Sequence, residues 1–124
     1  MARRRSRALT DAEAPVMAVL WERQPATVAD IVRGLSKRRA VSYSTVQTIL
    51  RILETKGYVA HDKVARAFVY RALVDERQAR RRALRHLATS LFKGSPSLLV
   101  LNVLEDDRID PEELKRLKKL IEDA

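Results

Sequence analysis

The segment from Ser42 to Gly57 constrains the fold most, because at helical spacing it divides into an apolar face and a hydrogen-bonding face. The apolar face consists of Val46, Ile49, Leu50 and Leu53. The opposite face presents Ser44, Gln47, Thr48 and Arg51. Short neutral donors and one arginine suit a groove full of hydrogen-bond acceptors, so we predict a helix that reads DNA.

Both ends of this helix are marked. Ser42 can cap the N-terminus with its hydroxyl, and Lys56-Gly57 supplies a cationic last turn and a residue that tolerates the left-handed conformation. A surface helix of this length usually carries several Glu and Lys residues, yet Glu54 is its only acid and lies in the last turn. The composition therefore favours a binding face.

Positive charge is concentrated in the first part of the chain. The formal net charge is +9; residues 1–73 hold 14 Lys and Arg against 6 Asp and Glu, whereas residues 74–124 hold 11 against 10. This excess favours a polyanionic partner, here double-stranded DNA. Residues 1–8 are interpreted as a flexible basic arm and not as a targeting segment, because no apolar run follows them; a solvated tail without function is the alternative.

The composition argues against several classes of protein. No stretch approaches the roughly 18 to 20 apolar residues that cross a bilayer, so we expect a cytoplasmic chain without membrane insertion. There is no cysteine, and His61 and His86 are the only histidines, so we expect no metal and no other cofactor. With only 3 glycines and no phosphate-binding loop, the chain is not expected to be an enzyme.

Two shorter helices are predicted before residue 42. Thr10-Asp11-Ala12-Glu13 has the form of a capping box and opens the first, which should end at Gln24-Pro25. Pro15 would remove a backbone hydrogen bond, so this helix should begin later than the box suggests or bend at its start. The second begins at Thr27-Val28-Ala29-Asp30. Together the three helices indicate a helix-turn-helix core.

A two-stranded wing is expected next, because the apolar period changes to about two after Gly57. The strands are predicted at residues 58–61 and 67–71, with Asp62 to Arg66 as the turn. Lys63 and Arg66 would lie at the tip and contact phosphates beside the groove; an ordinary solvated hairpin tip is the alternative.

Three further helices are predicted from Asp75 onwards. The first ends at Gly94, the second follows Ser95-Pro96, and the third begins at Asp110-Pro111. The second is apolar nearly all round, and about 50 residues cannot cover it on several sides, so we predict a two-fold homodimer formed through this region. The expected dimerisation residues are Leu87, Leu91, Leu98, Leu101, Leu104, Leu117 and Ile121.

The predicted fold is mainly α with a small β-hairpin wing. Residues 9–73 would form an N-terminal winged helix-turn-helix domain that binds DNA. Residues 74–124 would form a C-terminal three-helix dimerisation region.

An ordered set of short motifs runs along nearly the whole chain. The motifs are Leu9-Thr10-x-x-Glu13 with Val16-Met17 and Leu20-Trp21, Ala26-Thr27-Val28, Tyr43-x-Thr45-Val46-x-Thr48 with Leu53 and Lys56-Gly57, Arg66 with Tyr70, and Gly94-Ser95 before Leu98 to Leu104. Each is weak alone, but in this order they resemble the bacterial penicillinase and methicillin-resistance repressors. The resemblance implies winged-helix dimers that repress genes, often those for a beta-lactamase and its membrane sensor.

The resemblance also implies a mode of release, because such repressors are inactivated when a sensor metalloprotease signal leads to cutting in the dimerisation helix. Asn102-Val103 stands at that place, where the better-known members have Asn followed by Phe. Asn102 can instead be a lone polar residue that fixes helix register in an apolar interface, and we favour this interpretation. Ala65 replaces a usual wing glycine, and the lack of cysteine excludes copper sensing by thiolates.

We therefore expect a homodimeric transcriptional repressor that recognises a palindromic operator. The resemblance implies beta-lactamase or related resistance genes as targets and a sensor-linked protease as a further partner. The expected base-reading residues are Ser44, Thr45, Gln47, Thr48 and Arg51, with Gln47 the candidate for adenine and Arg51 for guanine or phosphate. The expected backbone contacts are Ser42, Tyr43, Lys63 and Arg66.

The alternative hypothesis is a winged-helix adaptor. Its C-terminal helices would bind another protein or an anionic membrane surface through Arg80, Arg81, Arg82 and Arg85. Such a run of arginines on a helix is usually a solvated face. A monomer, or a stable complex with another chain, would favour the adaptor.

Overall fold

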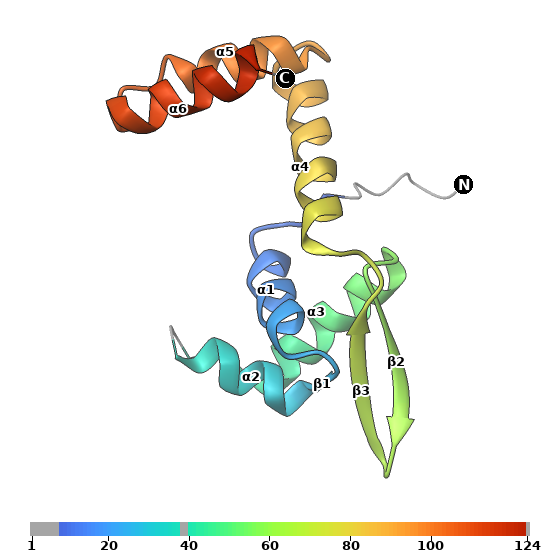
Figure 1. The fold of residues 1–124 in the computed structure, drawn as a ribbon. Coiled ribbons are helices and arrows are strands. Elements are labelled where there is room, and N and C mark those ends of the chain that lie inside the picture. Colours follow the sequence, from blue (N-terminus) through green and yellow to red (C-terminus); the bar gives the residue numbers. More distant parts are fainter. Residues whose placement is uncertain (1–7, 38–39, 124) are drawn as a thin grey trace, which may run out of the picture. The chain divides into compact units, whose positions relative to one another are not determined.

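The computed structural model describes residues 8–37 and 40–123, which form two compact units that divide after Ala83. The elements of the first unit are α1 (Glu13–Arg23), β1 (Ala26–Thr27), α2 (Val28–Ser36), α3 (Tyr43–Thr55), β2 (Val59–Val64) and β3 (Ala67–Ala72) (Figure 1). Helix α4 (Glu76–Leu91) spans the division, and α5 (Pro96–Leu104) and α6 (Pro111–Glu122) belong to the second unit.

Local capping signals set the starts of the first two helices. The expected box forms at Thr10, whose amide donates to Glu13 Oε1 at 2.8 Å while Glu13 N donates to Thr10 Oγ1 at 3.2 Å. Because α1 begins only at Glu13, Pro15 lies in its first turn, where the absent N–H breaks no helical hydrogen bond. A second box joins Thr27 and Asp30 at the start of α2.

Both ends of helix α3 and its buried face agree with the sequence prediction. Thr45 N donates to Ser42 Oγ at 3.2 Å, which caps the N-terminus, and Gly57 adopts a φ of +84° after the last turn. Its apolar face is buried: Val46, Leu50 and Leu53 have no exposed surface, and Ile49 is partly buried against the core. This packing fixes which face of α3 remains outside.

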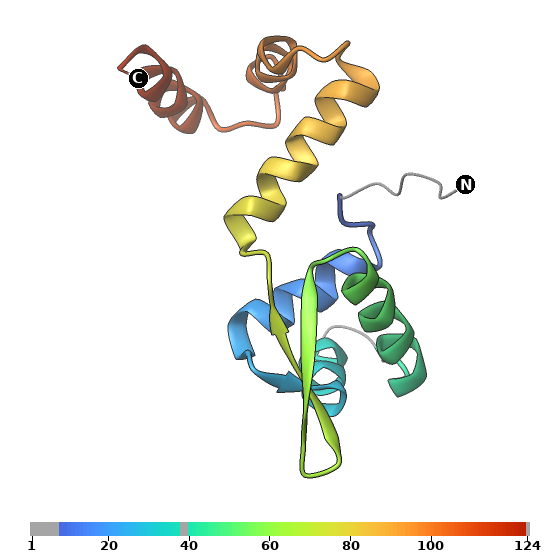
Figure 2. The same ribbon diagram turned by 90° about the vertical axis from the view of Figure 1, so that its right-hand side faces the viewer.

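The sheet differs from the expected two-stranded wing. It has three antiparallel strands in the order β1-β3-β2, because the short strand β1 pairs with β3 through Ala26 opposite Tyr70. The hairpin turn is also shorter than predicted: Val64 pairs with Ala67, which leaves only Ala65 and Arg66 in the turn, both with positive φ. The tip of the β2–β3 hairpin projects beyond the helices (Figure 2).

The core of the first unit continues past residue 73. Val74 and Ala79 are buried with the residues of α1 to α3, and Trp21 Nε1 donates to Val74 O at 2.9 Å. The Arg82 guanidinium lies 5.1 Å above the centre of the buried Tyr58 ring. These contacts attach the first turns of α4 to the winged helix, so this unit ends later than the boundary that we expected from the sequence.

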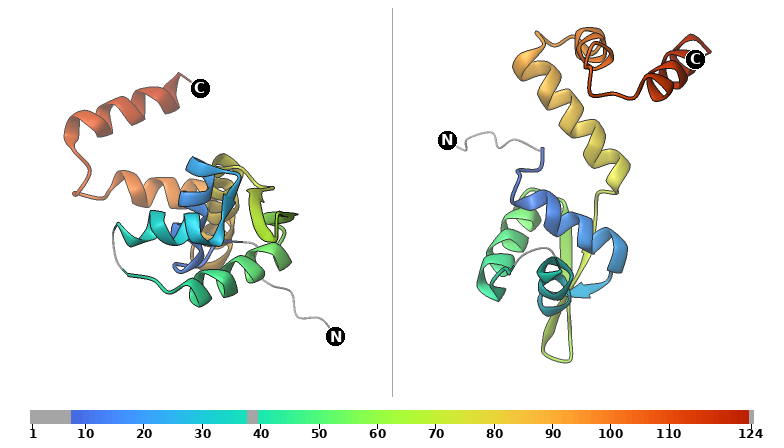
Figure 3. Two further views of the ribbon diagram at one scale, coloured as in Figure 1. Left: turned by 90° about the horizontal axis from the view of Figure 1, so that it is seen from below. Right: turned by 90° about the vertical axis from the view of Figure 1, so that its left-hand side faces the viewer.

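The second unit leaves much of its apolar surface exposed. Among its described hydrophobic residues only Ala88 and Leu99 are buried. Helices α5 and α6 begin at the expected caps, Ser95 and Asp110, and lie apart from each other (Figure 3). Within the described residues no single helix is both long and apolar enough to cross a membrane, although the bent pair α4 and α5 together reaches that length and composition.

Candidate DNA-binding surface

The outer face of α3 is built from hydroxyl, amide and guanidinium groups. Ser44, Thr45, Thr48 and Arg51 are exposed and Gln47 is partly exposed, because the buried face of the same helix is held in the core. Tyr43 begins the helix and is 53% exposed. The predicted base-reading residues are thus brought together on one accessible surface.

Hydrogen bonds within α3 limit what its hydroxyl groups can offer to a base. Ser42 Oγ accepts from Thr45 N and lies 2.7 Å from Thr45 Oγ1, to which it donates. Thr48 Oγ1 donates to Ser44 O at 3.0 Å. With that proton engaged, Thr48 can present its methyl group or accept a hydrogen bond, which suits a thymine methyl or an exocyclic amino group.

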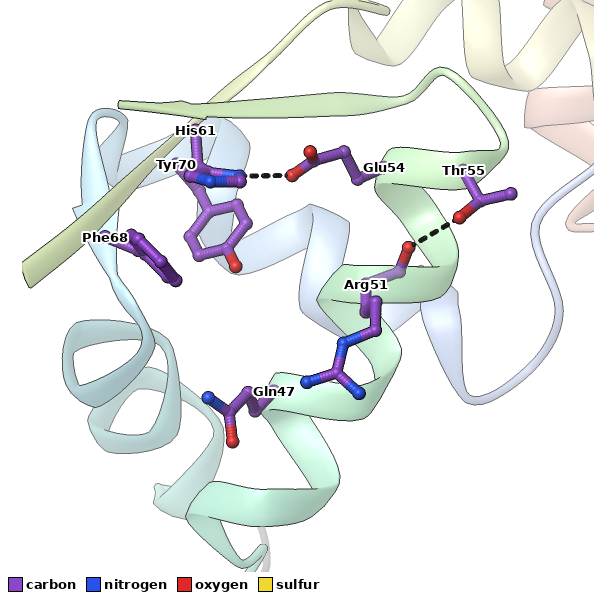
Figure 4. Close-up of a pocket in the computed structure, with 7 residues that line it drawn as sticks. All are labelled: Gln47, Arg51, Glu54, Thr55, His61, Phe68 and Tyr70. Atoms are coloured by element: carbon purple, nitrogen blue, oxygen red, sulfur yellow. Dashed lines mark hydrogen bonds and ion pairs between the residues drawn. The ribbon is translucent and has the colours of Figure 1, made fainter. Parts of the chain in front are cut away.

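A hollow of about 330 Å³ lies between α3 and the wing (Figure 4). Its lining residues are Gln47, Arg51, Glu54, Thr55, His61, Phe68 and Tyr70. Gln47 and Arg51 were expected to contact DNA. Glu54 and the wing side chains of His61, Phe68 and Tyr70 were not expected at this surface. No sequence signal marks these additions, because they meet only when the hairpin folds against α3.

The wing side of the hollow is a cluster of rings. His61 and Tyr70 lie opposite each other on β2 and β3, with ring centres 5.4 Å apart. The ring centre of Phe68 lies 4.5 Å from that of His61. His61 Nδ1 is 2.5 Å from Glu54 Oε1 on α3. Burial, together with the negative charge of Glu54, raises the pKa of the Tyr70 hydroxyl, so this group stays protonated.

The predicted cations of the wing lie at different places. Arg66 is in the turn, whereas Lys63 lies within β2 opposite Phe68 and not in the turn as expected. Since directly opposed and alternate residues share one face of a hairpin, Lys63 is on the same face as His61, Phe68 and Tyr70. Both cations are exposed.

A nearly buried ion pair joins the end of α3 to the start of α1. Lys56 Nζ lies 2.7 Å from Glu13 Oε1 and donates to Ala8 O at 2.9 Å, and the two side chains are only 7% and 5% exposed. Burial alone would raise the pKa of Glu13, but hydrogen bonds from Lys56 and Thr10 outweigh burial and lower it. The sequence suggested only local roles for both residues at helix ends.

The predicted dimerisation residues remain accessible in the single chain. Leu91, Leu101 and Ile121 are more than half exposed, Leu87 and Leu98 are 37% exposed, and Leu104 and Leu117 are partly buried. Asn102 and Val103 lie inside α5, and both are exposed. The Asn102 amide donates to Leu98 O of its own helix at 2.8 Å.

Two of the four arginines that carry the adaptor hypothesis have contacts within the chain. Arg80 pairs with Glu76 at 3.2 Å, and Arg82 lies over Tyr58. These contacts weaken the case for a basic docking face on α4. Among residues 8–37 and 40–123, no group of three His, Asp or Glu side chains is placed to hold a metal ion.

Comparison with known proteins gives a consistent family. A family model described as penicillinase repressor matches residues 9–123. A penicillinase repressor of Bacillus licheniformis is 32% identical, with 93% of this chain and 90% of the relative covered. A methicillin resistance regulatory protein MecI of Staphylococcus aureus (strain N315) is 25% identical, with coverages of 91% and 92%.

Solved structures agree with the fold of the first unit. The DNA-binding domain of the repressor BlaI matches with a TM-score of 0.52 and 35% identity, over 60% of this chain and 90% of that one. The Bacillus licheniformis BlaI monomer in complex with the blaP half-operator matches with a TM-score of 0.50, again with 35% identity and the same coverages.

Proposed function

Because this chain belongs to the penicillinase repressor family, we propose that it is a homodimeric transcriptional repressor which binds a palindromic DNA operator through α3 and the wing. The observation that carries the proposal is the outer face of α3, where neutral hydrogen-bonding groups and Arg51 are exposed beside the cationic hairpin. This arrangement suits a major groove flanked by phosphates.

In this proposal the residues of α3 and the wing make different contacts with DNA. Gln47 contacts adenine and Arg51 contacts guanine or phosphate, with Ser44, Thr45 and Thr48 alongside them. Lys63, Arg66 and Tyr43 contact the sugar–phosphate backbone. Ser42 acts chiefly through its cap on α3, since its hydroxyl both accepts from Thr45 N and donates to Thr45 Oγ1.

The exposed aliphatic side chains of α4, α5 and α6 support the dimer. A single chain that leaves Leu91, Leu101 and Ile121 more than half exposed gains by burying them against a second copy. Two reading helices held by one dimer would address two half-sites related by the same two-fold axis, which gives a palindrome.

Release by proteolysis is the finer part of the proposal. Cutting at Asn102–Val103, by a sensor-linked protease, would break α5 and remove the link between half-sites. Because both residues are helical, α5 must first unwind locally around them. For Asn102 itself we favour the setting of register in the dimer, since a buried polar residue there must be aligned with a partner. Resistance genes such as those for a beta-lactamase are the proposed targets.

The test is a selection of genomic fragments by the purified protein at about physiological salt, with the bound DNA sequenced. Light scattering on the same sample measures the mass against 14.2 kDa for one chain. We expect a palindrome bound by a dimer. A monomer that binds DNA without sequence preference would contradict the proposal and favour the adaptor.

A further inference from the structure

Glu54 is an unexpected neighbour for side chains that contact DNA. Its carboxylate lines the same hollow as Gln47 and Arg51, and it is the only acid among the seven lining residues (Figure 4). A carboxylate beside a phosphate backbone repels it, and this repulsion grows where water is partly excluded. A surface that binds DNA therefore needs a group that offsets the charge of Glu54.

His61 is placed to offset that charge. Its Nδ1 lies 2.5 Å from Glu54 Oε1, while Phe68 and Tyr70 hold the imidazole ring from β3. Glu54 belongs to α3 and His61 to β2, so this contact joins the two sides of the hollow. The two side chains are 40% and 31% exposed, which leaves the pair accessible to DNA.

We propose that Glu54 and His61 form a charge pair beside the DNA-binding surface that tunes the affinity for DNA, because protonation of His61 offsets the negative charge of Glu54. This inference rests on the proposed function, because it concerns the same surface. Neither residue needs to contact a base.

The direction of the effect follows from the charge of the pair. An ordinary imidazole gains a proton near pH 6.5, and it is the side chain whose charge changes between about pH 5 and 8. With neutral His61 the pair carries one negative charge, and with protonated His61 it carries none. Less negative charge on the protein beside the phosphates strengthens binding, so the affinity for DNA should rise as the pH falls.

Other charged groups around His61 keep their charge over this range. Arg51 on α3 stays cationic, and the raised pKa of Tyr70 on β3 keeps that hydroxyl neutral. On the wing, Asp62 is paired with Arg71 at 3.5 Å, and Lys63 lies further along β2. Within this cluster, the imidazole is therefore the one type of side chain whose charge changes between about pH 5 and 8.

The experiment measures dissociation constants by fluorescence anisotropy from about pH 5.5 to 8 at constant ionic strength. The probes are the duplex enriched in the selection described above and a mixed-sequence duplex of equal length. The proteins are the wild type, His61→Gln, Glu54→Gln and the control His86→Gln, which alters the other histidine of the chain, exposed on α4. Circular dichroism verifies that each variant is folded.

We expect wild-type affinity to rise roughly two- to fivefold on acidification. His61→Gln should be nearly independent of pH and match the wild type at high pH, because Glu54 then stays uncompensated. Glu54→Gln should also lose the pH dependence but bind more tightly than the wild type at high pH. His86→Gln should keep the wild-type profile.

Several results would overturn the inference. A pH dependence retained in His61→Gln would exclude His61 as its source. Weaker binding by Glu54→Gln at every pH would show that Glu54 aids binding directly, and a changed sequence preference in that variant would make Glu54 a base-contacting residue. Failure of the wild type to bind either duplex would contradict the proposed function, and this inference with it.

Discussion

At the scale of single residues, the wing turn carries a backbone conformation that its side chains disfavour. Ala65 and Arg66 have φ values of 47° and 72°, in the left-handed region that favours glycine. A two-residue hairpin turn of this kind usually contains Asn-Gly or Gly-Gly. The strain is tolerated because the strands are paired up to Val64 and Ala67 on either side.

Substituting Ala65→Gly should stabilise the first unit by roughly 0.5 to 1 kcal/mol, because glycine adopts this conformation without the steric cost of a Cβ. Urea unfolding followed by circular dichroism measures the change. The matched control is Ala67→Gly, at an exposed position of β3, which should destabilise by a similar amount. Equal destabilisation by both substitutions would contradict the conformation assigned to the turn.

The Glu13–Lys56 pair makes a second prediction at this scale. Substituting Glu13→Gln leaves the ammonium of Lys56 nearly buried without its partner, so the free energy of unfolding should fall by about 2 to 4 kcal/mol. Glu113→Gln, which removes an exposed partner of Arg116, is the control and should have no measurable effect. A similar loss in both variants would show that the pair has no special role.

The pH dependence of this pair has a definite sign. The folded protein lowers the pKa of Glu13, so the pair contributes its full stability above the ordinary value of 4.5 for a free carboxyl. That stability is lost as the pH falls through the lowered pKa of the folded state. Urea midpoints measured from about pH 7 down to pH 3 should therefore decline more steeply in the wild type than in Glu13→Gln.

At the scale of elements, α3 and the hairpin should contribute differently to DNA binding. In the proposed complex Arg51 contacts a base in the major groove, so Arg51→Ala should relax specificity at one position of each half-site by roughly 1 to 3 kcal/mol. Lys63→Ala would remove a proposed phosphate contact and should weaken binding to all sequences alike, with a flatter salt dependence. Binding of enriched and mixed-sequence duplexes over a range of salt separates the two effects. Equal, sequence-independent losses would exclude base reading by Arg51.

The helices could be predicted from the sequence because their ends are marked locally. Ser42, Ser95 and Asp110 cap the helices that they were expected to cap, and Gly57 takes the left-handed conformation predicted for it. These signals act over a few residues, so no knowledge of the tertiary fold is needed to recognise them.

The elements that the sequence did not predict depend on distant partners. Strand β1 has only two residues, too few to show a period, and it forms because β3 lies beside it. Lys56 and Glu13 are 43 positions apart, and His61 and Glu54 lie on different elements. Such pairs become visible only when the fold brings them together, which is why the sequence predicted a role in DNA binding for only Gln47 and Arg51 among the residues that line the hollow.

At the scale of the whole molecule, the chain has one unit with a complete core and one without. Residues of α1, α2, α3 and the sheet bury a continuous cluster, whereas the second unit exposes leucines on every helix that it contains. The first unit can therefore fold by its own packing, and the second gains most from a partner. Dimerisation would then couple the stability of α5 to the binding of two half-sites.

This coupling predicts the effect of a single charge in α5. Leu101 is 52% exposed in the isolated chain, so Leu101→Asp should leave the first unit folded but place a carboxylate in the apolar contact of the proposed dimer. Light scattering should show a mass near 14.2 kDa, and affinity for the palindrome should fall about 100-fold or more while affinity for one half-site is unchanged. Ser97→Asp adds the same charge at the exposed start of α5 and serves as the control. A Leu101→Asp protein that remains dimeric would show that the dimer interface does not include Leu101. A monomer that binds the palindrome as tightly as the wild type would show that avidity does not contribute to binding.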